Sequence, residues 1–158
     1  MKGTGMKKWL LVLAMLFSQG AFGKWEAYVP ARLADGVTIA SHAGHGGFVV
    51  FKQDYAFSAK VVYTGEIRPT SVAGSQVLSG FFGVDRDYPV QDMKYGNEVK
   101  VTEDDRDYWM PVSFDVLTDM QKKLKKGEAF TAYVRLLGES GSRWVFLLDG
   151  FSSASRKP

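Results

Sequence analysis

The sequence contains no cysteine and only two histidines among its 158 residues. Without cysteine the chain has no disulfide bonds and no thiol to carry a lipoprotein anchor, so its stability has to come from packing. It also offers no apolar run of membrane-spanning length near its start. The uncharged stretch from Trp9 to Phe17 has nine residues, whereas a helix that crosses a bilayer needs about 20.

This short apolar run is typical of a secretory signal peptide, which we predict at residues 1–23 with a start at Met1 or Met6. Three lysines precede the run, and small residues, Ala21 and Gly23, occupy the two positions that a signal peptidase recognises. We therefore expect cleavage after Gly23 and a soluble mature protein without a transmembrane segment. The expected location is the periplasm, with secretion from the cell as the alternative.

Removal of the signal segment changes the charge of the chain. All 17 acidic residues lie beyond Gly23, and three of the 20 basic residues lie before it, so 17 of each sign remain. A neutral mature chain lacks the bulk positive charge of a nucleic-acid-binding protein. Its length, from residue 24 to residue 158, suits one domain with a hydrophobic core.

The clearest structural pattern lies between residues 116 and 151. Three apolar residues, Leu117, Met120 and Leu124, follow helical spacing and predict a short helix that ends near Gly127. Residues 129–138 then alternate between apolar and polar, as in a half-buried strand. In the next predicted strand, at 143–151, Trp144 to Leu148 are apolar on both faces. We predict a β-hairpin with its turn at residues 139–142 and its second strand either in a central position or closed into a barrel.

The preceding part of the chain predicts more strands. Residues 24–55 suggest a β-rich extension, with short strands at 36–40 and 48–51, before a domain that spans residues 56–151. Within that domain alternation is clear from Phe57 to Tyr63. The remaining strand predictions are VLSGFFGV at 77–84, EVKV at 98–101 and WMPVSFDV at 109–116, the last an edge strand or one that begins at Pro111. Residues 152–158 suggest a disordered tail.

The order of these elements resembles the OB-fold, a five-stranded barrel with a helix between its third and fourth strands. The barrel strands would be the predicted ones at 60–67, 77–84, 109–116, 129–138 and 143–151. The fold class is thus mainly β with one short helix, an OB-like barrel after a β-rich extension; an antiparallel α+β sheet is the alternative. The resemblance implies a binding face on the second and third strands.

Two groups of residues are candidate metal ligands. His42 and His45 lie in a glycine-rich segment, where a third ligand for zinc or copper would have to come from afar. The DRDY motif of residues 85–88 recurs at 105–108, where Glu103 and Asp104 add further acidic groups. The arginines within the two copies oppose a cation, which favours salt-bridged turns over a calcium site. We expect no metal and no cofactor.

Catalytic signatures are weak in this chain, since no serine lies in a G-x-S-x-G elbow. We therefore expect a noncatalytic binding module that contacts another envelope or secreted protein. The alternatives are recognition of an oligosaccharide or oligonucleotide, and a metal-dependent enzyme that uses the two histidines. Aromatic side chains at predicted strand ends are the candidate contact residues: Phe81, Phe82, Tyr88, Tyr108 and Trp109.

Overall fold

The computed structural model describes residues 27–41, 47–83 and 94–153, and within them the chain is mainly β. The predicted signal peptide lies outside these residues. Five strands form a closed ring: β2 (Gly47–Pro69), β3 (Asn97–Glu103), β4 (Arg106–Val112), β5 (Ala129–Gly141) and β6 (Arg143–Ser153). A two-residue strand, β1 (Val29–Pro30), pairs with β2 from outside the ring. The described helices are α2 (Leu33–Ser41), α3 (Val72–Phe81) and α4 (Phe114–Lys123).

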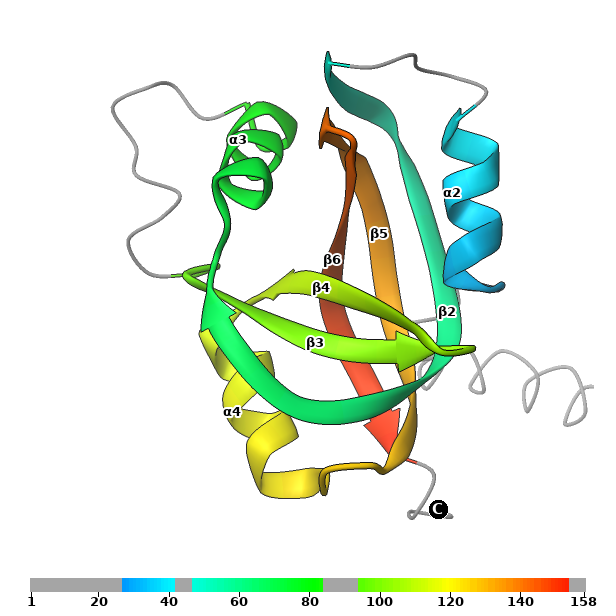
Figure 1. Ribbon diagram of the computed structural model, residues 1–158, viewed down its shortest axis with the longest axis vertical. Coiled ribbons are helices and arrows are strands. Elements are labelled where there is room, and N and C mark those ends of the chain that lie inside the picture. Colours follow the sequence, from blue (N-terminus) through cyan, green and yellow to red (C-terminus); the bar gives the residue numbers. More distant parts are fainter. Residues whose placement is uncertain (1–26, 42–46, 84–93, 154–158) are drawn as a thin grey trace, which may run out of the picture.

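The long strand β2 holds the ring together, because its two halves pair with different neighbours. Its first half runs antiparallel to β5 and its second half antiparallel to β3. Figure 1 shows β2 bending around the ring, with α3 near one end of the molecule and α4 near the other. The ring closes at a single parallel pair, Val112 beside Leu148. The helix between the third and fourth ring strands is α4, as the OB-like order predicts.

The alternating strand patterns produce the main core inside the ring. Phe57, Ala59 and Val61 of β2 are buried there, together with Phe130 to Leu136 at every second position of β5. The predicted helical face is buried as well, although α4 ends at Lys123 and Gly127 adopts its positive φ in the following turn. The apolar character of β6 on both faces is explained by two clusters, since Phe146 faces the main core and Leu147 faces α3.

The strand prediction at residues 77–84 was wrong, because residues 72–81 form helix α3. A short apolar run is compatible with a strand or a helix. The helix is stabilised at its start by the Ser71 side chain, which accepts a hydrogen bond from the Gly74 amide. The predicted strand EVKV belongs to β3 and takes the second place in the ring. The structure therefore contains more helix than the one short helix predicted.

Four other assignments also differ from the predictions. Residues 36–40, predicted as a strand, lie in α2, whose Leu33 is fully buried in the main core. Strand β2 runs without a break across the expected domain boundary between residues 55 and 56. The predicted strand at 109–116 ends at Val112 because Ser113 caps α4, and β6 continues through Ser153 into the expected tail.

Pro111 lies within β4 and not at its start. It pairs with Glu98 of β3, while the opposite side of β4 pairs only through Val112. A proline is tolerated there because few ladder hydrogen bonds are required of it. Among the described helices, none has the length and apolar character needed to cross a membrane.

Candidate functional site

Helix α3 covers the outer face of the β5–β6 hairpin. Its Val77 and Leu78 pack against Leu137, Val145 and Leu147 in a second apolar cluster, separate from the main core. All five side chains are almost completely buried. Burial of this area fixes α3 on the sheet and leaves the opposite side of the helix facing outward.

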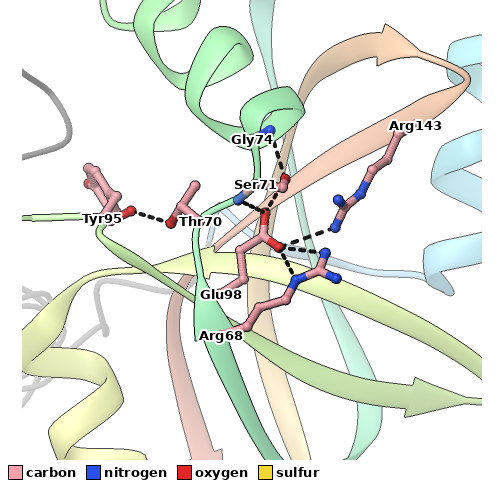
Figure 2. A network of polar contacts seen from close by, with 7 residues as sticks. All are labelled: Arg68, Thr70, Ser71, Gly74, Tyr95, Glu98 and Arg143. Atoms are coloured by element: carbon pink, nitrogen blue, oxygen red, sulfur yellow. Dashed lines mark hydrogen bonds and ion pairs between the residues drawn. The ribbon is translucent and has the colours of Figure 1, made fainter.

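A buried carboxylate, that of Glu98, holds the start of α3 in place (Figure 2). One carboxylate oxygen accepts hydrogen bonds from the Ser71 hydroxyl at 2.8 Å and the Ser71 amide at 3.2 Å. The other accepts from Arg68 at 2.8 Å and from Arg143 at 3.2 Å. Glu98 thereby connects β3 to the end of β2, to the cap of α3 and to the start of β6.

The charge of Glu98 is stabilised in this position. Burial raises the pKa of its carboxyl group, but the hydrogen bonds from Ser71 and Arg68 and the charge of Arg143 outweigh burial, so the pKa lies below its usual value. The side chain is only 1% exposed. A buried carboxylate with two arginine partners and a helix cap is a positioning element, because its hydrogen bonds all go to other parts of the fold.

Two close approaches complete the junction between α3 and the sheet. The Thr70 hydroxyl donates to the Tyr95 carbonyl at 2.5 Å, which ties the end of β2 to the segment before β3 (Figure 2). A Cβ atom on Gly74 would lie 2.7 Å from the nearer oxygen of Glu98. Only glycine at position 74 therefore lets the helix approach the carboxylate this closely.

A groove of about 780 Å³ runs along the outward side of α3. Helix α3 supplies Val72, Ser75, Gln76 and Ser79, and other segments add Phe48, Pro69, Thr70, Tyr95 and Gly96. Val72 and Phe48 are 74% and 56% exposed. Exposure of large apolar side chains in a concave surface is typical of a binding site.

The chemistry of the groove is that of an uncharged binding surface. The described residues that line it carry hydroxyl, amide, phenol and apolar groups, and none is an aspartate, glutamate, histidine, lysine or arginine. The Gln76 side-chain oxygen accepts from the Ser140 hydroxyl at 2.7 Å, so its amide nitrogen remains available as a donor. The groove can bury apolar groups and form neutral hydrogen bonds, and its lining supplies no phosphate-binding cation.

No model of a protein family, no curated protein and no solved structure matches this chain.

The structure brings two of the predicted contact residues together beside this groove. Phe81 and Phe82 form an edge-to-face pair with ring centroids 5.3 Å apart, and the Phe82 ring stacks on Tyr95. Phe81 also packs against the second apolar cluster. Tyr88 lies outside the described residues. Of this group, Tyr95 lines the groove directly.

Tyr108 and Trp109 lie elsewhere and face in opposite directions, as neighbours on a strand do. The Tyr108 ring packs edge-to-face on Phe146 at the margin of the main core. Trp109 lies on the outer face of the ring, where the Arg68 guanidinium is 4.0 Å from its ring centroid. One face of the indole is thus already occupied by a cation–π contact within the chain.

The acidic stretch at residues 103–107 forms the β3–β4 turn. The Glu103 carboxylate accepts hydrogen bonds from the Leu33 amide at 2.9 Å and the Ala34 amide at 3.3 Å, and so caps the start of α2. Asp104 forms an ion pair with Arg32. The contacts of Glu103 and Asp104, next to this copy of the DRDY motif, agree with a salt-bridged turn. Among the described residues, no three or more metal-ligating side chains lie together as a group. The other copy, His42 and His45 lie outside the described residues.

Sequence reasoning missed the groove because its residues come from three separate stretches of the sequence. Phe48 and Tyr95 are 47 positions apart, and only the fold of β2 and α3 brings them to one surface. One local signal could have identified the helix: Ser71 is a preferred N-cap residue and stands directly before the apolar residue Val72. With α3 assigned as a helix, Val72, Ser75 and Ser79 would have fallen on one face.

Proposed function

We propose that this protein is an exported, noncatalytic binding module that docks another envelope or secreted protein in the groove beside α3. The observation that carries the proposal is the exposure of Val72 and Phe48 within a groove whose described lining is uncharged. Such a surface gains free energy by burying apolar area against a partner and offers neutral hydrogen bonds for specificity. Export is inferred from the signal-peptide pattern of residues 1–23.

The rigidity of the site supports binding. Glu98 fixes the N-terminal end of α3, and the second apolar cluster fixes the buried face of the helix. A surface held in one conformation loses little conformational entropy when a partner docks. The uncharged lining favours an apolar protein segment over an oligonucleotide, whose phosphates require lysine or arginine.

Helices α3 and α4 offer a matched pair of variants for the test. Val72 and Phe114 are both exposed apolar residues at the first position of a helix, and both follow a capping serine. Aspartate at either position is compatible with the helix because a negative charge is favourable in the first turn. Val72→Asp, however, places a charge in the α3 groove, whereas Phe114→Asp does not.

The experiment is affinity capture from the native envelope and secreted fractions with the wild-type protein and both variants, followed by mass spectrometry. We expect one or a few proteins that bind the wild type and Phe114→Asp and are depleted about tenfold or more with Val72→Asp. A protein lost only with Phe114→Asp would bind at helix α4 and would not count for the α3 groove. Equal recovery with Val72→Asp would overturn the proposed site. Recovery of a glycan in place of a protein would favour the oligosaccharide alternative.

A further inference from the structure

Strand β6 is central in the ring, but its last residues, beyond Leu148, have an unpaired edge on the side away from the α3 groove. Its residues from Arg143 to Ser153 pair with β5 along one side. On its other side the only strand pairing among the described residues is the one between Val112 and Leu148. Beyond Leu148, every second residue of Gly150 to Ser152 therefore directs its amide and carbonyl groups away from the sheet.

A groove of about 610 Å³ lies between this edge and helix α4, which run alongside each other (Figure 1). One wall is the strand from Asp149 to Ser153, and the other is the face of α4 that carries Phe114, Asp115 and Lys122. Phe114 is 64% exposed. An apolar side chain and an unpaired strand edge thus border the same groove.

The charges in this groove are partly neutralised within the chain. Asp149 receives two hydrogen bonds from Arg135, at 2.6 and 2.8 Å, and Lys123 pairs with Asp119 at 2.7 Å. Asp115 and Lys122 form no ion pair within the part of the chain that the structure describes. They are seven residues apart on α4, or about 10 Å, which is the length of about three residues of an extended chain.

We propose that an extended peptide of a partner protein adds to β6 in this groove as a further strand. Its backbone pairs with the outward-directed amides and carbonyls between Gly150 and Ser152, an apolar side chain covers Phe114, and an acidic side chain about three residues away lies beside Lys122. A small molecule would not satisfy a row of alternating donors and acceptors, whereas a peptide backbone has the same repeat. This surface is independent of the α3 groove.

The test selects peptides from a phage-displayed library of ten-residue sequences on the purified exported protein. The Phe114→Asp variant serves for counter-selection. Selected peptides are then synthesised with unmodified amides and with alternate amides N-methylated in both possible phases. N-methylation leaves the side chains unchanged and removes the backbone donors on which strand addition depends.

We expect selected peptides to combine an apolar and an acidic residue and to perturb the amide resonances of Gly150 to Ser152. One N-methylation phase should weaken binding about tenfold or more, the equivalent of one lost hydrogen bond. Lys122→Glu should also weaken it, whereas Lys60→Glu, at an exposed lysine of β2, should not.

The proposal is overturned if no peptide is enriched, or if the selected peptides bind Phe114→Asp as tightly as the wild type. It is overturned as well if neither N-methylation phase weakens binding. Concentration-dependent dimerisation that protects the same β6 amides would assign this edge to a second copy of the chain and would contradict the proposal.

Discussion

The Glu98 carboxylate and the Arg68 guanidinium are joined by a hydrogen bond of 2.8 Å, and Glu98 is the better buried of the two. Through this contact the end of β2 is tied to β3 at the point where the chain turns into α3. The same carboxylate caps the helix through Ser71. The shape of the α3 groove therefore depends on a residue that does not line it.

Replacement of Glu98 by glutamine should destabilise the protein by about 1–3 kcal/mol, because two arginines and the helix cap lose a charged acceptor. Urea denaturation measures the change. The control is Glu66→Gln, which removes an ion pair with Lys100 from a side chain that is 53% exposed and should change stability by about 0.5 kcal/mol or less. Equal effects of the two variants would show that Glu98 does not hold the fold together.

The contribution of Glu98 should depend on pH. Its folded-state pKa is lowered, so its stabilising effect is complete above the unfolded-state pKa of about 4.3 and is lost as the pH falls through the folded-state value. The difference in free energy of unfolding between the wild type and Glu98→Gln should be constant between about pH 7 and pH 5 and shrink on further acidification. A difference that grows as the pH falls would contradict the assignment.

The substitution Gly74→Ala tests the close approach of α3 to Glu98. In an exposed helix alanine is about 1 kcal/mol more favourable than glycine. Here the added Cβ atom would lie 2.7 Å from a Glu98 oxygen, so we expect destabilisation by about 1–3 kcal/mol. Ser75→Ala, at the next position, has no such contact and should stabilise slightly or have no effect. Stabilisation by Gly74→Ala in thermal unfolding would disprove the close approach.

The cap that Glu103 provides for α2 gives another prediction. Glu103→Ala removes the acceptor of the Leu33 and Ala34 amides, which should cost about 1 kcal/mol and speed hydrogen exchange along α2. Asp105→Asn, at an exposed position of the same turn, is the control. If exchange in α2 is equally slow in both variants, the helix does not depend on this cap.

Much of the fold follows from local patterns in the sequence. The hairpin of β5 and β6 and the buried face of α4 were predicted because alternation and helical spacing extend over enough residues to be unambiguous. The assignment of β6 to a central position also holds, since Leu147 and Leu148 are buried on opposite faces. These elements carry their own pattern and need no information about distant neighbours.

The sequence did not predict which strand takes the second position in the ring, and it did not predict the groove beside α3. Strand β3 has only seven residues, and its place depends on pairing with β2 and β4 rather than on its own pattern. Helix α3 was mistaken for a strand because Val77 and Leu78 lie in a short apolar run that fits either element. Because α3 was not recognised as a helix, no sequence pattern placed Val72 near Phe48.

The most direct measurement is photo-crosslinking in living cells with a benzophenone amino acid at position 72, compared with position 62. Val62 is also exposed but lies on β2, outside the described lining of the groove. We expect a discrete crosslinked protein from position 72, its loss when Gln76 is replaced by glutamate, and none from position 62. Identical crosslinks from both positions, or none from position 72, would contradict the proposal that the groove beside α3 is the binding site.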